Sequence, residues 1–156
     1  MSRNEEGKKI LFLSPLTGRS VSLEEVPDPV FSQKIIGDGM AVSPSDGRIV
    51  SPVDAQVVSV ADTAHAYGLK TEDGIELLIH AGIDTVKMNG EGFETFVETG
   101  AKVKKGDKLL SFDMDLVKEK GYKTQTMFLV ADAKGKEVEV VEAADADNNT
   151  KIMNLK

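Results

Sequence analysis

The chain has 156 residues, 40% of them apolar, a length that suits one domain with its own hydrophobic core better than two. It contains no cysteine, which excludes disulfides, thiolate catalysis and cysteine-ligated metals. Its 26 acidic and 19 basic residues give a net charge of −7, so nucleic acid is a disfavoured partner and a basic protein a favoured one.

No apolar run approaches the roughly 18 residues of a membrane-spanning helix, and the charged start lacks the apolar core of a signal peptide. We therefore expect a cytoplasmic protein. Residues 1–8 are predicted to form a mobile tail, because they are polar and lie at a chain end. Residues 9–156 are predicted to form a single domain.

Short aliphatic and β-branched runs alternate with turn-forming residues along most of the chain. Turns are expected where glycine stands beside aspartate, as in Asp73-Gly74 and Gly106-Asp107. The expected strands are Ile10–Ser14, Ser20–Val26, Arg48–Pro52, Gln56–Ala61, Ala66–Thr71, Ile75–His80, Phe93–Glu98, Lys108–Asp113, Thr124–Ala131, Lys136–Val141 and Thr150–Leu155. Short strands at this spacing predict an all-β sandwich or barrel.

Two short helical pieces are expected to interrupt the strands. Asp28 is a suitable N-cap for a helical turn that begins at Pro29 and that Gly37 can end. Asp113 can cap a second piece over Met114–Lys120, just before a glycine.

The two histidines of the chain, His65 and His80, both lie in runs with the alternating character of a strand. Alternation over Ile75–His80 turns the odd-numbered, aliphatic residues toward the core and presents His80 outward beside Leu78. The same alternation places the Thr63 hydroxyl and the His65 ring on one face, where the hydroxyl can fix the ring tautomer.

A pair of histidines suits phosphoryl transfer. A neutral imidazole nitrogen is a competent nucleophile toward phosphorus, and an ordinary pKa of about 6.5 leaves the ring largely neutral in the cytoplasm. Transfer needs in-line positioning and donors for the equatorial oxygens more than it needs acid–base chemistry. One ring can therefore attack while the other donates hydrogen bonds.

Spacing alone leaves two alternatives open. Both histidines can be ordinary residues of a β surface. They can also supply a zinc ion with three ligands together with Asp84, as in a metal-dependent hydrolase, although the lack of further histidine or cysteine argues against an intrinsic site.

Several segments match one known pattern together. They are Ile75–Val86 (IELLIHAGIDTV), Gly90–Phe93, Gly106-Asp107, Val26–Phe31, Gly37–Gly39, Ser51–Asp54 and Thr63–Ala66. Taken together they resemble the glucose-type enzyme IIA family of the sugar phosphotransferase system. The likeness covers about residues 14–130, far more than a short motif match.

The resemblance implies a distorted antiparallel β-sandwich and a phosphocarrier function. In the family pattern the histidine at the position of His80 accepts a phosphoryl group on Nε2 from the histidine-containing phosphocarrier protein and passes it to enzyme IIB of a sugar permease. The carbonyl at Gly82 holds Nδ1–H, His65 lies against the phosphoryl oxygens, and Thr63 orients His65.

The resemblance also implies an apolar docking surface of Val30, Phe31 and Leu78, with Asp28 and Asp84 as an acidic rim that faces basic residues of the donor. Simpler alternatives exist for three of these residues. Phe31 can be a core residue of its helical turn, Asp28 only an N-cap, and Asp84 only a turn residue.

The chain departs from the family pattern at several positions. Ala81 stands where a bulkier apolar residue is usual and Ala61 where phenylalanine is frequent, so we expect a flatter docking surface. The stretch after residue 131 matches poorly, which leaves the last strand boundaries open. Some relatives carry an amphipathic N-terminal anchor, but Met1–Lys9 is polar and we expect no membrane tether.

A second hypothesis is a regulatory module that binds permeases or kinases through the same apolar surface, with phosphorylation as the switch. No cofactor is expected to be required in either case. Zinc is expected only at a partner interface, where His65 and His80 lack a further ligand that the partner would add. We expect a monomer.

Overall fold

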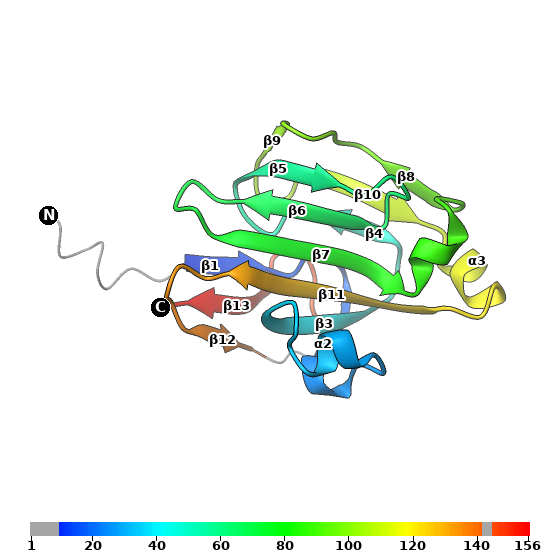
Figure 1. Ribbon diagram of the computed structural model, residues 1–156, viewed down its shortest axis with the longest axis horizontal. Coiled ribbons are helices and arrows are strands. Elements are labelled where there is room, and N and C mark those ends of the chain that lie inside the picture. Colours follow the sequence, from blue (N-terminus) through cyan, green and yellow to red (C-terminus); the bar gives the residue numbers. More distant parts are fainter. Residues whose placement is uncertain (1–9, 142–144) are drawn as a thin grey trace, which may run out of the picture.

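The computed structural model describes residues 10–141 and 145–156, which form antiparallel β-sheets joined by short helical turns (Figure 1). The tail predicted for residues 1–8 lies outside the described residues. The strands are β1 (Ile10–Leu13), β2 (Gly18–Ser22), β3 (Asp38–Pro44), β4 (Arg48–Val50), β5 (Ala55–Val60), β6 (Ala66–Lys70), β7 (Glu76–Ile83), β8 (Phe93–Thr95), β9 (Lys102–Val103), β10 (Lys108–Phe112), β11 (Lys123–Asp132), β12 (Val138–Val140) and β13 (Lys151–Leu155). The helical turns are η1 (Leu23–Glu25), α2 (Pro29–Ser32), η2 (Thr85–Met88) and α3 (Met114–Glu119).

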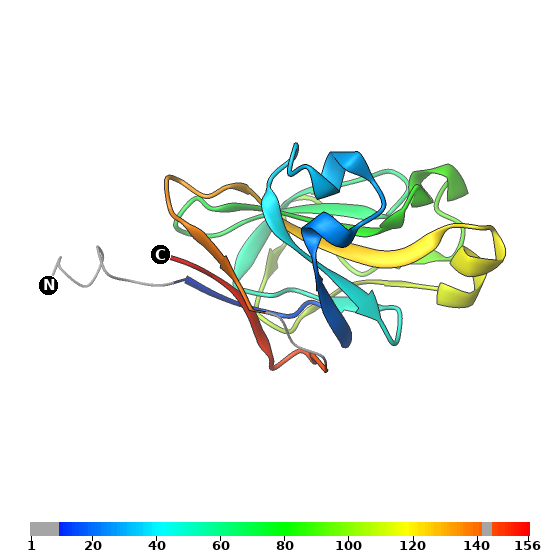
Figure 2. The same ribbon diagram turned by 90° about the horizontal axis from the view of Figure 1, so that it is seen from below.

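Over the described residues the strands form one large sheet and two small ones. The large sheet has the order β2-β3-β11-β7-β6-β5-β9, and the small sheets have the orders β4-β10-β8 and β1-β13-β12. The long strands β7 and β11 run side by side across the middle of the large sheet (Figures 1 and 2). This arrangement confirms the predicted antiparallel β-sandwich, and no closed barrel is formed in this part of the chain.

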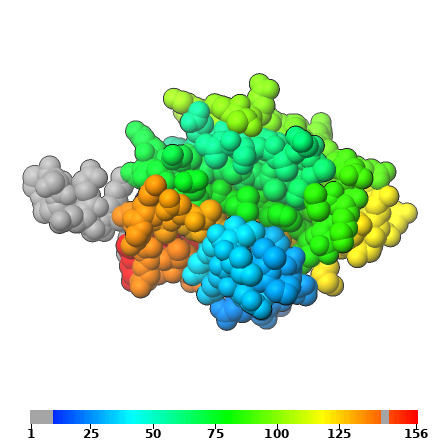
Figure 3. Space-filling view, in the orientation of Figure 1, coloured from blue at the N-terminus to red at the C-terminus, as the bar shows by residue number. Residues whose placement is uncertain are grey.

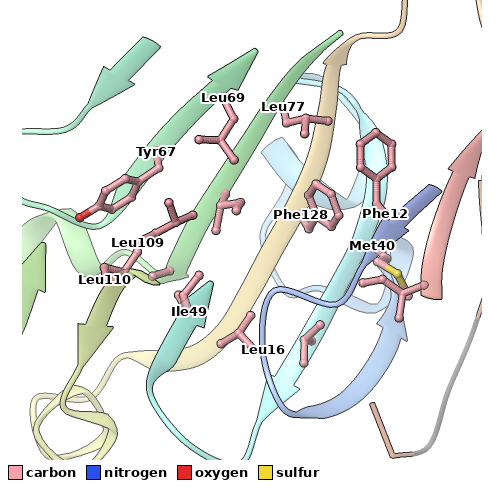
Figure 4. Packing of buried hydrophobic residues seen from close by; sticks show 14 of the residues in the cluster. Phe12, Leu16, Met40, Ile49, Tyr67, Leu69, Leu77, Leu109, Leu110 and Phe128 are labelled. Carbon is pink, nitrogen blue, oxygen red and sulfur yellow. The ribbon is translucent and has the colours of Figure 1, made fainter. Parts of the chain in front are cut away.

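One continuous core fills the space between the sheets. Tyr67, Leu77 and Phe128 of the large sheet are fully buried or nearly so, and residues of both small sheets belong to the same cluster. Figure 4 shows these side chains gathered between the strands. The rings of Phe12 and Phe128 meet edge to face with centroids 5.6 Å apart, a favoured aromatic geometry.

A second, smaller apolar cluster lies on the opposite face of the large sheet. Alternation along β11 turns Phe128 into the main core and its neighbours Met127 and Leu129 to this other face. There they are covered by Leu23 of η1 and Phe31 of α2. Figure 3 shows the blue segment that contains α2 on the near face of the molecule, next to residues coloured green.

Both predicted helical pieces are present. The Asp28 carboxylate accepts a hydrogen bond from the Val30 amide at 3.0 Å, with proline at the first helical position. The Asp113 carboxylate likewise accepts from the Leu116 amide at 3.1 Å, although the helix ends at Glu119 rather than at Lys120.

The predicted strand Ser20–Val26 is too long. It ends at Ser22, where the Ser22 hydroxyl accepts from the Glu24 amide and the Glu25 carboxylate accepts from the Ser22 amide. This capping box starts η1 and turns the chain out of the sheet.

The sequence interpretation missed strands β3 and β9. In β3, Gly39 suggested a turn, yet it is needed for close approach of two backbones, because a β-carbon at Gly39 would overlap the carbonyl oxygen of Phe128 on β11. β9 has only two residues, too few to show an alternation.

We expect Gly39→Ala to destabilise the fold by about 2–3 kcal/mol, because the added methyl group meets backbone atoms that cannot move alone. Gly135→Ala is the comparison, since no atom lies within 4 Å of the added methyl there and only its φ of 81° is unfavourable, at about 1 kcal/mol. Urea unfolding of both variants measures the difference. Equal losses of stability in the two variants would contradict the close backbone contact between β3 and β11 at Gly39.

Candidate functional site

His80 lies on β7, on the face of the large sheet that carries the second cluster. Its neighbours Ile79 and Ala81 are fully buried in the main core, whereas His80 and Leu78 are only partly buried. The predicted alternation of this strand is confirmed. The ring of Phe31 lies 5.0 Å from that of His80, centroid to centroid, so α2 forms one wall beside the imidazole.

A backbone carbonyl near the end of β7 fixes the orientation of the His80 ring. The Nδ1 atom of His80 lies 2.8 Å from the carbonyl oxygen of Gly82. Because a carbonyl can only accept, Nδ1 carries the proton of this bond, and Nε2 of the neutral ring keeps a free lone pair. Gly82 has a φ of 84°, a backbone conformation that suits glycine.

His65 lies between β5 and β6, and here the strand prediction was wrong. Ala64 has a φ of 58°, so Thr63–His65 form a turn instead of an extended strand. The turn nevertheless brings the Thr63 hydroxyl to 2.5 Å from Nδ1 of His65. The expected contact between Thr63 and His65 is therefore present. It depends on the left-handed conformation of Ala64 and not on strand alternation.

The structure brings the two histidines together. The His65 and His80 ring centroids are 4.8 Å apart and the rings are nearly perpendicular, at 82°. Pairing of β6 with β7 sets Ala66 opposite His80, and the Ala81 amide donates to the His65 carbonyl at 2.7 Å. The backbone thus fixes the separation of the rings.

Both imidazoles are held in the neutral form. Burial lowers the pKa of His65 to about 4, and the positive charge that His80 can carry adds to the effect. Burial also lowers the pKa of His80, while the hydrogen bond to the Gly82 carbonyl and the carboxylates of Asp28 and Asp84 act in the opposite direction. Neutral rings are the nucleophilic form.

The predicted docking residues differ in exposure. Phe31 is only 5% exposed and packs in the second cluster, so the alternative of a core residue describes its burial, while its ring still contacts His80. Val30 is 42% exposed, and Leu78 is partly buried at the edge of the cluster.

The sequence interpretation missed two apolar residues beside α2. Ile35 and Ile36 are 66% and 38% exposed, and the Ile35 amide donates to the Val30 carbonyl, which joins them to the helical turn. In the sequence, the only indication of this surface is the pair of adjacent isoleucines outside the expected strands. With Val30 they form what we call the α2 apolar surface.

The two predicted rim residues have local structural roles as well. Asp28 is the N-cap of α2, and Asp84 adopts a φ of 63° in the turn after β7. Both alternatives are therefore correct descriptions of their backbone roles. Because both carboxylates also act on the pKa of His80, their charges lie close to the site.

Ala81 cannot flatten the docking surface as expected, because it is fully buried on the core face of β7. The part of the expectation that rested on Ala81 was wrong, since alternation turns position 81 away from His80. The part that rested on Ala61 stays a prediction. Ala61 is partly buried, and its carbonyl accepts from the Ala64 amide at 2.8 Å in the turn that carries Thr63.

No group of three His, Cys, Asp or Glu side chains within residues 10–141 and 145–156 is arranged to hold a metal ion. The proposed trio of His65, His80 and Asp84 is therefore not gathered. In the same part of the chain, no helix is long and apolar enough to cross a membrane.

The chain is a member of the EIIA 1 family of the phosphoenolpyruvate-dependent sugar phosphotransferase system, whose family model matches residues 10–136. This membership confirms the resemblance found in the sequence and implies phosphotransfer within the sugar phosphotransferase system.

Its relatives include several glucose-specific EIIA components. The protein from Bacillus cereus is 45% identical over 145 residues, which cover 92% of this chain and 88% of that protein. The one from Halalkalibacterium halodurans is 51% identical over 120 residues, 77% and 69% of the two chains. The solved glucose permease IIA from Mycoplasma capricolum superposes with a TM-score of 0.91 at 34% identity, covering 96% of this chain and 97% of that one.

The lowered pKa of His65 predicts a pH dependence of stability. Between pH 6.5 and about 4 the unfolded chain binds a proton that folded His65 resists, so stability falls as the pH is lowered through this window. We expect His65→Gln to remove on the order of 2 kcal/mol of that dependence. Urea unfolding of both proteins from pH 7 to 4 measures it, and a variant with an unchanged slope would contradict the burial argument.

Proposed function

We propose that this EIIA component carries a phosphoryl group on Nε2 of His80, accepting it in the cytoplasm from the histidine-containing phosphocarrier protein and passing it to enzyme IIB of a sugar permease. The observation that carries the proposal is the bond of 2.8 Å between Nδ1 and the Gly82 carbonyl, which leaves Nε2 as the free nitrogen. The glucose-specific names of the relatives suggest that the permease is one for glucose.

In the first transfer, the lone pair of His80 Nε2 forms a bond to phosphorus. The bond from phosphorus to the donor's histidine nitrogen breaks, and its electron pair stays on the donor. No proton has to move on this side, since Nδ1 keeps its hydrogen. The ring gains positive charge, which the Gly82 carbonyl and the carboxylates of Asp28 and Asp84 stabilise.

In this proposal His65 supports the phosphoryl oxygens. Its ring lies 4.8 Å from that of His80, and the Thr63 hydroxyl at Nδ1 holds its orientation. If Thr63 donates to Nδ1, the proton of neutral His65 lies on Nε2 and can be donated to an equatorial oxygen. The second transfer then reverses the first: a nucleophile of enzyme IIB bonds to phosphorus as the bond to His80 Nε2 breaks.

The partners dock, in this proposal, on the α2 apolar surface with Phe31 and Leu78 as the wall and floor beside His80. Val30 and Ile35 expose apolar area near the site, and Asp28 and Asp84 add negative charge. An apolar centre with charged surroundings suits transient complexes, because charge accelerates encounter and a small area permits release. A basic donor surface fits the net charge of −7.

The same exposed surface favours a second role, regulatory binding of permeases or kinases that senses whether His80 is phosphorylated. Zinc enters only as an extension of this role. The two neighbouring imidazoles offer two ligands, and a partner carboxylate would have to supply another. Transfer itself requires no cofactor in this proposal.

Phosphorylation of histidine variants tests the central step. With labelled phosphocarrier protein as donor, we expect His80→Gln to accept no label, because an amide nitrogen is not a nucleophile. We expect His65→Gln to accept label but to pass it to enzyme IIB about a hundredfold more slowly, because a flexible amide does not hold its donor at the phosphoryl oxygens as the oriented ring does. Label on a folded His80→Gln variant would refute the assignment of the nucleophile.

Substitution of Asp28 separates its role as the N-cap of α2 from the effect of its negative charge on the site. Asn caps a helix as well as Asp does, so Asp28→Asn should keep the stability, whereas Asp28→Ala should lose about 1 kcal/mol. We expect the asparagine variant to take label roughly twofold to fivefold more slowly at low salt. The matched control is Asp113→Asn, a cap on α3. Equal rates in the two asparagine variants would leave Asp28 as a cap alone.

A further inference from the structure

Thr85 is a fully buried polar residue two positions after the end of β7, and the function proposed above does not use it. It is the first residue of η2, and its hydroxyl donates to the Ala81 carbonyl at 2.6 Å. A buried hydroxyl is retained where its bond is well made, because an unpaired one is costly. This bond spans the end of β7, which contains Gly82.

The side chain of Thr85 also packs against Gly82. A β-carbon added at Gly82 would overlap the Thr85 methyl group and lie 3.0 Å from the Lys123 carbonyl oxygen of β11. The pairing of β7 with β11 sets Ile83 opposite Lys123 and Ala81 opposite Thr126, so β11 has one extra residue opposite Gly82. Gly82 is thus enclosed by Thr85 on one side and by a bulged strand on the other.

These contacts bear on His80 through two successive peptide units, Ala81–Gly82 and Gly82–Ile83. The Ala81 amide donates to the His65 carbonyl, and the Ala81 carbonyl accepts from Thr85. The peptide that follows Ala81 leads to Gly82, whose carbonyl accepts from His80 Nδ1. If this peptide rotates, the acceptor moves away from the ring.

We propose that Thr85 is a positioning residue for His80. Its hydroxyl fixes the Ala81 carbonyl and its methyl group fixes Gly82, so that the Gly82 carbonyl stays aligned with Nδ1 and the ring keeps its proton there. The consequence for transfer rests on the function proposed above, but the effect on the ring tautomer does not. Thr85 acts through Gly82 and has no direct contact with the phosphoryl group in this proposal.

Nitrogen-15 NMR of the imidazole rings tests the proposal, because it reports which nitrogen of His80 is protonated. We expect the wild-type ring to be protonated on Nδ1 and Thr85→Val, which keeps the shape but loses the hydroxyl, to show a mixture of both tautomers. Thr85→Ser keeps the hydroxyl and should restore the Nδ1 form. Label transfer from the phosphocarrier protein should fall roughly tenfold in Thr85→Val and recover in Thr85→Ser.

Thr71→Val is the matched control. Thr71 is also buried, and its hydroxyl accepts from the Ile75 amide at 3.1 Å. This bond lies just before β7 begins, at the opposite end of the strand from Gly82. Thr71→Val should lower stability without changing the His80 tautomer. If Thr85→Val does not fold, Thr85→Ala, which also removes the hydroxyl but places no methyl group against the Ala81 carbonyl, is measured in the same way.

A folded Thr85→Val or Thr85→Ala protein with wild-type tautomer would overturn the proposal, and so would a tautomer change in Thr71→Val. Failure of the phosphocarrier function is a separate result. If wild-type protein takes no label, the proposed function fails, while the NMR comparison still decides whether Thr85 positions the ring.

Discussion

The hydrogen bond from His80 Nδ1 to the Gly82 carbonyl is the interaction on which the site depends. It holds the ring and decides which nitrogen is free. The bond joins the ring to a carbonyl two residues later in the same strand. This local geometry includes a φ of 84° at Gly82, a backbone conformation that suits glycine. The crowding around Gly82 leaves no room for a side chain. The chemistry of His80 is therefore determined by the backbone just after it.

The balance of burial and charge then sets the protonation of the rings. His65 is buried beside another imidazole, and both influences keep it neutral. His80 experiences burial too, but the carboxylates of Asp28 and Asp84 offset part of it. In the proposed transfer, an arriving phosphoryl dianion would favour positive charge on the rings, so the site would be neutral before transfer and better suited to positive charge after it.

The sequence allowed the fold class and the outward position of His80 to be predicted, because period-two alternation and turn residues are local properties. The meeting of His65 with His80 followed only from the resemblance to the family, because alternation does not describe the turn that carries His65. It could not predict β3, since the need for Gly39 comes from the backbone of β11, a strand remote in sequence. Strand alternation was the wrong reason to expect the contact of Thr63 with His65. The contact depends on the left-handed φ of Ala64, which nothing in the sequence indicates because alanine rarely adopts it. The burial of Phe31 likewise depends on the second cluster, which exists only in the folded sheet.

In the proposed function, stability depends on the buried main core and partner recognition on the exposed α2 apolar surface, which are separate parts of the molecule. Ala81 and Ile79 belong to the main core, where a change of volume alters packing throughout the sandwich. Val30, Ile35 and Ile36 are exposed on the opposite face, so their replacement changes what a partner contacts at little cost to folding. His80 lies on the strand between these regions, with its neighbours anchored in the core and its ring against Phe31. If partners dock there as proposed, partner preference can change on the α2 apolar surface while the geometry of His80 and Gly82 stays fixed.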